Sequence, residues 1–267
     1  MRRDMGEHYE ELADTYEENW AYSPAYVQWM AAQITTSLAL RQTDRFADVG
    51  CGTGLFSREI AWHLLPQHPL LCVDPSAAML KQVEDSEHLM PVQASAEDLA
   101  AQRIKLPYAP LDAVLVKEAI HHVADTAQTV AGLAGLLGPE GRLLVVMLPP
   151  TIEYPLFDQA LARYEALQPD PAAIADHMTA AGLHTSMSFV EHQVRLPVEK
   201  YLSMVRARYM SVLSTFAEEE IEAGIRQIRD RHSEAELSFP DRFVFLLGRR
   251  HSDSPSRQTI AASGGAL

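Results

Sequence analysis

The sequence predicts an α/β protein with a doubly wound, mostly parallel sheet. Short apolar runs alternate with segments of helical periodicity over residues 45–150. These runs are apolar at nearly every position, which is typical of strands buried on both faces. The first run breaks into a glycine-rich turn that opens a helix. We therefore expect ligands to bind beyond the carboxyl ends of the strands, where the strand order reverses.

The individual elements follow from periodicity and from helix start and stop signals. Strands are expected over residues 45–49, 70–74, 90–93, 111–116, 142–148, 187–196 and 243–247. Helices are expected over residues 24–40, 55–65, 76–83, 125–137, 171–182, 199–214 and 217–232, after a first helix that carries Tyr9, Leu12, Tyr16 and Trp20. The segment 215–218 has the pattern of a capping box for the last helix.

The order of these elements suggests five segments. We expect an N-terminal helical cap over residues 1–44, an α/β core over 45–196, a helical insertion or lid over 197–238, a last core strand over 239–250 and a flexible tail over 251–267. The two helices between the last two strands interrupt the alternation of the core, which is why we interpret them as an insertion.

Composition excludes several classes of protein. Of 267 residues, 47% are hydrophobic and 22% are charged, which excludes a mostly disordered chain. The formal net charge of −14 disfavours a nucleic-acid partner, because an acidic surface repels phosphates. No segment approaches the roughly 20 unbroken apolar residues of a membrane helix, so we expect no membrane partner.

Cysteine content and the first residues indicate the compartment. Cys51 and Cys72 are too few for a disulfide scaffold or a four-thiolate metal site. Two arginines near the start have no apolar segment behind them, so we expect no secretory signal. These features predict a cytoplasmic protein with reduced thiols, which we take to be a monomer or a homodimer.

The segment Asp48-Val49-Gly50-Cys51-Gly52-Thr53-Gly54 is the strongest functional signal. A dinucleotide site needs G-x-G-x-x-G, with pyrophosphate at the helix N-terminus. Counted from Gly50, the sixth position is Leu55, so that pattern fails. Asp48 would also repel phosphates, whereas it would attract the ammonium and sulfonium groups of S-adenosylmethionine. Charge therefore favours the sulfonium ligand over the dinucleotide.

With this segment the sequence resembles the class I S-adenosylmethionine-dependent methyltransferases, especially the group related to quinone-biosynthesis and small-molecule methyltransferases. The matching segments are residues 48–54, 73–76 with 79–80, 94–99, 111–123 and 141–144. The resemblance implies a Rossmann-like methyltransferase fold with a seven-stranded sheet. It also implies S-adenosyl-L-methionine as cofactor and S-adenosyl-L-homocysteine as product.

The resemblance implies a cofactor role for residues of the first two motifs. Gly50, Gly52 and the backbone at Cys51 would line the methionine portion, and Asp48 would face its ammonium. Asp74, at the end of the second strand, would accept hydrogen bonds from both ribose hydroxyls, which fits an acid at a strand end beside the switch point. Pro75 and Met79 belong to the same motif and are expected to contact the cofactor.

Further cofactor contacts are implied at the third and fourth motifs. Ala96 and Glu97 would meet the adenine edge, with Ser95 standing where the family more often has Asp. The carbonyl of Lys117, at the end of the fourth strand, would accept from the methionine ammonium. The N-terminal segment often folds over the cofactor in this family, so Tyr16 is either a cofactor contact or, as aromatic residues at helical spacing usually are, part of the core.

His121 and His122 follow the fourth strand on the side where an acceptor would enter. One of them would serve as the general base for the acceptor nucleophile, since imidazole titrates near neutral pH. The alternative is that both pack and hydrogen-bond the loop. Family members that bind a metal need an acidic cluster starting at this strand end, and Glu118 alone fits, so we expect no metal.

The predicted lid has two interpretations. Its helical face of Tyr201, Val205, Tyr209, Val212 and Phe216 would either wall an acceptor pocket or pack on the sheet. Arg206 and Arg208 beside that face would either bind a carboxylate of the acceptor or lie in solvent.

Together these features predict a methyltransferase that acts on an O, N or C nucleophile of a small-molecule acceptor. The alternative on the same fold is a protein that binds S-adenosylmethionine without methylating and catalyses a cyclisation or rearrangement. Methylation of tRNA or protein, and a nicotinamide-dependent oxidoreductase, are less favoured by the acidity and by the glycine pattern.

Overall fold

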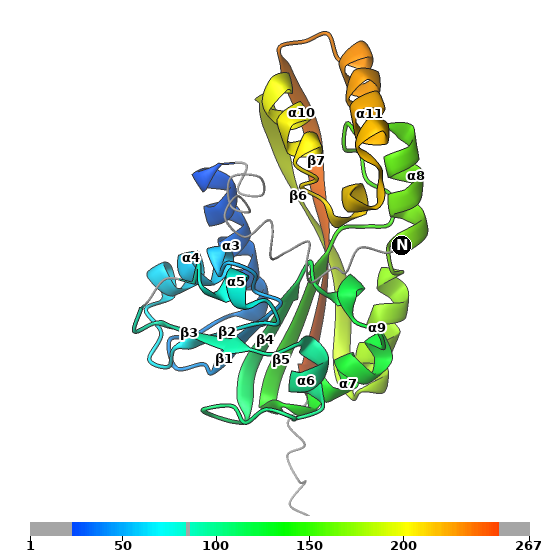
Figure 1. The fold of residues 1–267 in the computed structure, drawn as a ribbon. Coiled ribbons are helices and arrows are strands. Elements are labelled where there is room, and N and C mark those ends of the chain that lie inside the picture. The colour runs from blue at the N-terminus through cyan, green and yellow to red at the C-terminus, as the bar shows by residue number, and fades with distance from the viewer. Residues whose placement is uncertain (1–22, 84–85, 251–267) are drawn as a thin grey trace, which may run out of the picture.

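The computed structural model describes residues 23–83 and 86–250, and these contain one seven-stranded sheet (Figure 1). The strand order is β3-β2-β1-β4-β5-β7-β6. Strands β1 to β5 are parallel, and β7 runs antiparallel to both β5 and β6. The strands are β1 (Phe46–Val49), β2 (Leu70–Asp74), β3 (Leu89–Gln93), β4 (Leu111–Lys117), β5 (Leu137–Met147), β6 (Leu183–Pro197) and β7 (Glu236–Arg250). The predicted mostly parallel, doubly wound sheet is confirmed, and the order reverses between β1 and β4.

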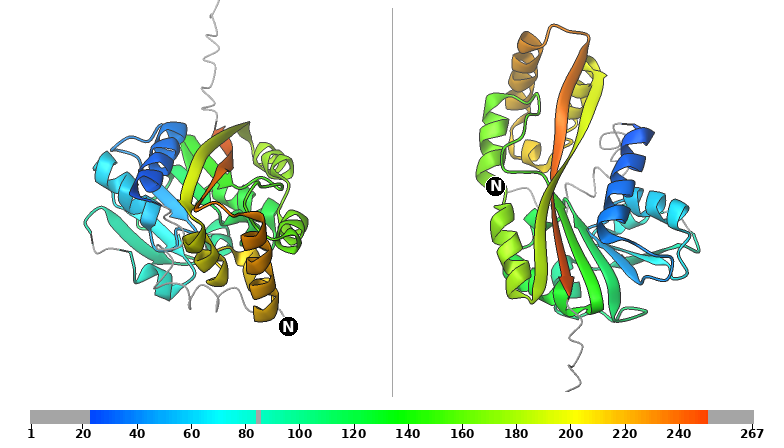
Figure 2. Two further views of the ribbon diagram at one scale, coloured as in Figure 1. Left: turned by 90° about the horizontal axis from the view of Figure 1, so that it is seen from above. Right: turned by 180° about the vertical axis from the view of Figure 1, so that it is seen from behind.

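Helices cover both faces of this sheet (Figure 2). One face carries α3 (Pro24–Leu38), α4 (Leu55–Leu64) and α5 (Ala77–Leu80), and the other carries α6 (Ala96–Ala100), α7 (Thr126–Gly135) and α9 (Pro171–Ala180). The remaining helical segments are the 3-10 turn η1 (Ile120–His122), α8 (Asp158–Leu167), α10 (Val198–Arg206), the 3-10 turn η2 (Ser211–Thr215) and α11 (Glu218–Arg231).

Successive residues along a strand point into two separate hydrophobic cores, one on each face of the sheet. Phe46 of β1 points into the core under α3 and α4, whereas its neighbour Ala47 belongs to the core under α7 and α9. Alternation of this kind explains why the central strands are apolar at nearly every position. The core on the α3 side also continues into α10, η2 and α11, so the sheet and the segment between β6 and β7 share one hydrophobic cluster.

Helix α3 is fixed at both ends. The Ser23 hydroxyl accepts a hydrogen bond from the backbone N–H of Tyr26 at 3.2 Å, and Pro24 occupies the first turn. At the other end the buried Arg142 guanidinium donates to the carbonyl of Leu38 at 2.8 Å and to the carboxylate of Asp44 at 2.6 Å. This anchorage holds the helix whose first turn carries Tyr26 against the sheet.

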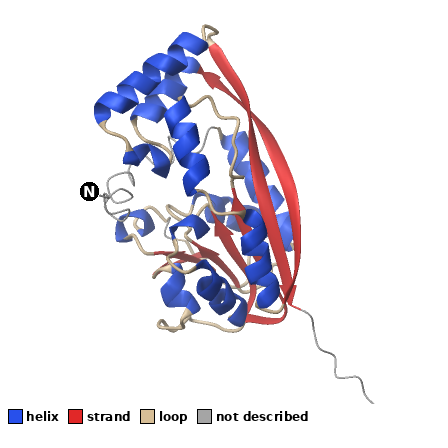
Figure 3. Ribbon diagram, turned by 90° about the vertical axis from the view of Figure 1, so that its right-hand side faces the viewer, coloured by secondary structure: helices blue, strands red, loops and turns tan. Residues whose placement is uncertain are grey.

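The β6/β7 hairpin is much longer than the sequence pattern predicts. Only residues 244–249 of β7 pair with β5, and residues 236–243 pair with β6 alone. This outer half extends beyond the sheet, and α10 and α11 lie on its concave side (Figure 3). One face of the outer half is buried and the other is exposed, so its sequence alternates and lacks the continuous apolar run by which the strands were predicted.

Three local predictions are wrong. The helix expected over residues 199–214 ends at Arg206, because Arg208 adopts a left-handed conformation with φ +55° and the chain continues as η2. The last helix begins at Glu218 and is capped by Glu220, which accepts from the backbone N–H of Ala217 at 2.8 Å, rather than by residues 215–218. The short α6 and the longer α8 were not predicted at all.

Candidate active site

The glycine turn after β1 is built from left-handed backbone. Gly50, Gly52 and Gly54 have φ values of +77°, +57° and +75°. The N–H of Gly50 donates to the carbonyl of Val73 at 2.7 Å, which closes the turn over the end of β2. A Cβ atom at Gly50 would lie 2.3 Å from the Cβ of Ala119, so glycine is required there on two grounds.

Asp74 ends β2 beside this turn and is buried. Its two carboxylate oxygens accept hydrogen bonds from the backbone N–H groups of Gly52 and Ser76, both at 2.9 Å. Burial raises the pKa of Asp74, and these two N–H groups oppose the rise. The carboxylate therefore ties the glycine turn to the start of α5. Each of its oxygens has further acceptor capacity.

Asp48 lies within β1 and is almost completely buried. The Ser57 hydroxyl of α4 donates to its carboxylate at 2.5 Å. Burial raises the pKa of Asp48 to about 6, while Ser57 and the nearby Lys117 charge lower it. Cys51 is half-buried next to the buried Cys72, and desolvation raises the pKa of the Cys51 thiol well above the ordinary value, so it stays a neutral thiol.

Residues of the second and third motifs are held mainly by local caps. Ser76 caps α5 by accepting from the N–H of Met79 at 3.2 Å, and Pro75 between Asp74 and Ser76 is exposed. Ser95 caps α6 in a capping box with Asp98. These caps place the residues on the same edge of the sheet as the glycine turn.

The carboxylate of Glu97, next to Ala96 at the start of α6, reaches a different partner. It accepts a hydrogen bond from the N–H of Ala124 at 3.1 Å. Glu97 therefore joins the predicted adenine segment to the loop that carries the two histidines.

His121 and His122 lie in η1, after β4, with their ring centroids 3.9 Å apart. Burial lowers the pKa of His121 to about 3, so this imidazole is neutral at pH 7. Its Nδ1 atom is buried and has no hydrogen-bond partner within the described part of the chain. His122 is exposed. The two rings thus differ: His121 is a half-buried, neutral group with a buried Nδ1 atom, and His122 is open to solvent.

The end of β4 carries two oppositely charged residues in succession. The Lys117 Nζ atom lies 4.5 Å from the ring centroid of Phe56 and 5.3 Å from that of Phe243. Burial lowers the pKa of Lys117, and the carboxylates of Glu118, Asp241 and Asp48 oppose that shift. The side chain thus turns toward β7, a direction that the sequence did not indicate.

Glu118 has a left-handed backbone with φ +52°, which is unusual for a residue with a side chain. Its carboxylate accepts from the N–H of Leu148 at 2.8 Å, which ties the end of β4 to the end of β5. Burial raises the pKa of Glu118 to about 7, so near neutral pH it exists in both protonation states.

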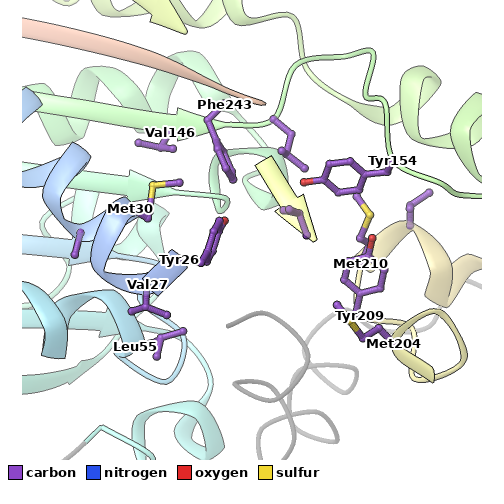
Figure 4. Close-up of a cluster of buried hydrophobic side chains, with 14 of the residues drawn as sticks. Tyr26, Val27, Met30, Leu55, Val146, Tyr154, Met204, Tyr209, Met210 and Phe243 are labelled. Carbon is purple, nitrogen blue, oxygen red and sulfur yellow. The ribbon is translucent and has the colours of Figure 1, made fainter. Parts of the chain in front are cut away.

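Sequence reasoning missed a second group of polar side chains, beside Lys117. Asp241 on β7 is 1% exposed, and it accepts a hydrogen bond from the Tyr154 hydroxyl. The Tyr26 hydroxyl also lowers its pKa. Figure 4 shows Tyr26 and Phe243 on one side of this region and Tyr154, Tyr209 and Met210 on the other. The missed signal is an acid in the apolar phase of a strand that alternates from Leu237 to Phe245.

The predicted lid side chains are mostly packed. Tyr201, Val205, Tyr209, Val212 and Phe216 are all buried, and the Tyr201 and Tyr209 hydroxyl oxygens are 3.2 Å apart. Arg206 pairs with Glu222 at 2.6 Å on the surface of α10 and α11, and Arg208 donates to the carbonyl of Phe216. Both arginines therefore bind partners within residues 197–238.

The glycine turn and Asp74 fit the group that the sequence motifs imply. The buried Thr53 hydroxyl lies within the glycine turn and has no hydrogen-bond partner among the described residues. A carboxylate at a strand end suits a ligand rich in hydroxyl donors. Tyr16, the remaining predicted cofactor contact, lies outside the described residues.

Neither a metal-binding cluster nor a membrane-spanning helix occurs among the described residues. Within residues 23–83 and 86–250, no group of three or more His, Cys, Asp or Glu side chains is placed to hold a metal ion. No helix in the same part of the chain is long and apolar enough to cross a membrane.

The strand order and the glycine turn at its switch point define the class I S-adenosylmethionine-dependent methyltransferase fold. A family model described as a methyltransferase domain matches residues 47–143. A solved structure of a putative methyltransferase from an antibiotic biosynthesis pathway of Anabaena variabilis has a TM-score of 0.62 at 17% identity, covering 81% of this chain and 95% of that one.

Curated relatives match part of the chain. An uncharacterized methyltransferase of Mycobacterium bovis is 34% identical over 99 residues, which cover 37% of this chain and 48% of the relative. A ubiquinone biosynthesis O-methyltransferase of Xanthomonas axonopodis pv. citri is 30% identical over 134 residues, 49% of this chain and 52% of the relative. The chain therefore spans about half the length of the curated relatives it matches.

Proposed function

We propose that the protein is a methyltransferase that uses S-adenosyl-L-methionine to methylate an O, N or C nucleophile of a small-molecule acceptor. The observation that carries the proposal is Asp74, held at the end of β2 by the N–H groups of Gly52 and Ser76 beside the left-handed glycine turn. This arrangement lies inside the segment that matches the methyltransferase domain. The net charge of −14 supports a small molecule rather than a nucleic acid as acceptor.

The protein's own contribution is alignment and desolvation. S-adenosylmethionine, when bound, supplies a methyl group on a sulfonium that is a good leaving group. Asp74 would fix the ribose. The glycines of the turn from Gly50 to Gly54 would let the protein backbone approach the cofactor closely. Holding the two reactants in line is worth roughly 7–11 kcal/mol in favourable cases. Little further chemistry is required of the side chains.

A general base is required only if the nucleophile must lose a proton. We propose His122 for that role over His121, because His122 is exposed and burial lowers the pKa of His121 to about 3. The pH–rate profiles of His121→Ala and His122→Ala test it. We expect His122→Ala to slow methyl transfer and to change the shape of the profile, and wild-type profiles for both variants would eliminate the base.

Titration calorimetry with S-adenosylhomocysteine, with NADH as the control ligand, tests the cofactor. We expect micromolar binding of the first and none of the second, and the reverse result would refute the proposal. Acceptors are then screened by mass spectrometry for the gain of one methyl group. Formation of S-adenosylhomocysteine during turnover separates methyl transfer from the alternative, a cyclisation or rearrangement that leaves S-adenosylmethionine intact.

A further inference from the structure

The buried face of the outer β6/β7 hairpin contains a single acidic side chain. Along β7 this face presents Leu237, Phe239, Asp241, Phe243 and Phe245, all of them buried. The residue opposite Asp241 on β6 is His192, which packs against Tyr26 and Trp29 of α3 with ring centroids 5.3 Å and 4.8 Å away. Asp241 therefore lies where the hairpin, α3 and the end of β4 meet.

The hydrogen bonding of Asp241 is incomplete. The Tyr154 hydroxyl donates to Oδ1, and the Tyr26 hydroxyl lies near the same carboxyl group. The Oδ2 atom is fully buried and has no hydrogen-bond partner within residues 23–83 and 86–250. Buried carboxylate oxygens in folded proteins almost always have a donor, so an unpartnered one destabilises the chain on its own and calls for a function.

Lys117 does not supply the missing donor. Its Nζ atom lies over the rings of Phe56 and Phe243, and it forms no ion pair with Asp241 in the described part of the chain. The Lys117 charge still acts on Asp241 and on Asp48, the acid of β1 behind the glycine turn.

From this geometry we propose that Asp241 is the polar anchor of the acceptor-binding site, and that the acceptor presents to Oδ2 a hydroxyl or amine donor carried on an apolar or aromatic body. The inference rests on the proposed function. Rings and thioethers of Tyr26, Tyr154, Tyr209, Phe243 and Met210 surround the region and suit an apolar body (Figure 4).

The charges around Asp241 select against an anionic acceptor. Among the described residues, the carboxyl groups of three acids act on the charge of Lys117: Asp241, Glu118 and Asp48. One cation is therefore shared by three carboxyl groups. A carboxylate or phosphate on the acceptor would add a further negative charge to this set. A neutral hydroxyl or a protonated amine instead satisfies the open oxygen and leaves the local charge unchanged or more balanced.

Matched small probes test the inference without knowledge of the natural acceptor. The full chain is saturated with S-adenosylhomocysteine, and the binding of 4-ethylphenol, benzylamine, 4-ethylanisole and 4-ethylbenzoate is measured by ligand-observed NMR. We expect the phenol and the amine to bind at least about tenfold more tightly than the anisole, which lacks a donor, because each gains a hydrogen bond to a charged group. The benzoate should bind most weakly.

Two variants assign the preference to Asp241. In Asp241→Asn we expect the ratio of the affinities for 4-ethylphenol and 4-ethylanisole, which we call the donor preference, to fall to about one. Binding of 4-ethylanisole should be unchanged, since the isosteric amide still accepts from Tyr154. The matched control is Glu191→Gln on the exposed face of the same hairpin, where Glu191 pairs with Arg242 at 2.8 Å, and it should keep the wild-type preference. The wild-type comparison of phenol with anisole stands even if Asp241→Asn fails to fold.

The outcomes separate this inference from the proposed function. Equal binding of phenol and anisole to the wild type, an unchanged preference in Asp241→Asn, or no binding of any probe would overturn the role of Asp241. If S-adenosylhomocysteine fails to bind while the Asp241-dependent preference persists in its absence, the proposed cofactor falls and the donor-selective site remains.

Discussion

Asp74 and Asp241 are both buried carboxylates on strands of the same sheet, yet different groups hold them. Backbone N–H groups of Gly52 and Ser76 occupy both oxygens of Asp74. A side-chain hydroxyl, that of Tyr154, holds one oxygen of Asp241, and the other oxygen has no partner in the described residues. The Asp74 carboxylate is therefore held by the protein backbone, whereas the Asp241 carboxylate is held by a side chain that a substitution can replace.

This difference fits the two ligands that we propose for the two ends of the site. A cofactor common to a whole class can be bound by backbone geometry, which changes little from one sequence to another. An acceptor differs between members of a class, so its recognition is better placed on side chains that substitution can alter. Four experiments break or sharpen the comparison, from the largest expected effect to the smallest.

Replacing Asp74 should have the largest effect. Asp74→Ala removes the proposed ribose acceptor and leaves the N–H groups of Gly52 and Ser76 without their partner. We expect a loss of about 1.5–3 kcal/mol in S-adenosylhomocysteine affinity by calorimetry, the usual contribution of hydrogen bonds to a charged group. Unchanged affinity in a variant with a native circular-dichroism spectrum would remove Asp74 from the site.

Gly50→Ala tests whether backbone geometry carries cofactor binding. The substitution forces a side chain into a φ of +77° and against the Cβ of Ala119 at 2.3 Å. We expect the affinity for S-adenosylhomocysteine to fall by about 2 kcal/mol, since left-handed backbone alone costs roughly 1–2 kcal/mol. The double variant Gly50→Ala/Ala119→Gly relieves only the steric contact, so it should recover part of the loss. Full recovery would show that the dihedral angle is unimportant.

Asp241 should make the protein less stable as the pH rises. Burial raises its pKa to about 6, above the unfolded value of 3.8, so the folded chain holds this proton more tightly. The stability contributed by the protonated form is complete below pH 3.8 and is lost as the pH rises through about 6.

Urea denaturation of the wild type and Asp241→Asn between pH 4 and 7.5 measures this contribution. The variant should show a flatter dependence over that range, because it lacks the titrating group. Asp48 and Glu118 have pKa values raised by burial to about 6 and 7, and they should retain part of the slope in the same direction. A variant curve parallel to the wild-type curve would contradict the assignment to Asp241.

The surface arginine of the lid should have the smallest effect. Arg206 is about half exposed, and its pair with Glu222 lies on the surface of α10 and α11. Arg206→Gln should change the free energy of unfolding by less than about 0.5 kcal/mol, as exposed pairs do. It should also leave the affinity for 4-ethylbenzoate unchanged. A clear loss of benzoate binding would revive the carboxylate-binding interpretation of the lid arginines.

The sequence predicts the fold of the edge that carries the glycine turn well, because its signals are local. The glycine turn and the acid at the end of β2 each follow directly on an apolar strand, and parallel strands bring their carboxyl ends to one edge. The roles assigned to individual side chains there remain predictions.

The acceptor end could not be predicted in the same way, because it is assembled from distant segments. Tyr154 and Asp241 are 87 residues apart in the sequence. The break after α10 depends on tertiary packing, since nothing in the Arg-Ala-Arg sequence forbids a helix, and the buried contact between Tyr201 and Tyr209 goes with the turn at Arg208. Only the alternation along β7 gave a local signal, and it is a period-2 pattern rather than an apolar run.

The hairpin has a consequence for how the molecule can be altered. Pro197 and Glu236 are paired opposite each other at its far end, and the N–H of Val198 donates to the carbonyl of Ala235 at 3.1 Å. The whole helical segment between them therefore leaves the sheet and returns to it at one point. The segment is therefore replaceable as a unit. We expect that a different helical segment can be grafted between positions 197 and 236 while the pairing of β6 with β7 stays in register. The graft must bring its own apolar cover for Leu237 and Phe239, and also for Phe157, which packs against Phe216 and Gly224 of the present segment.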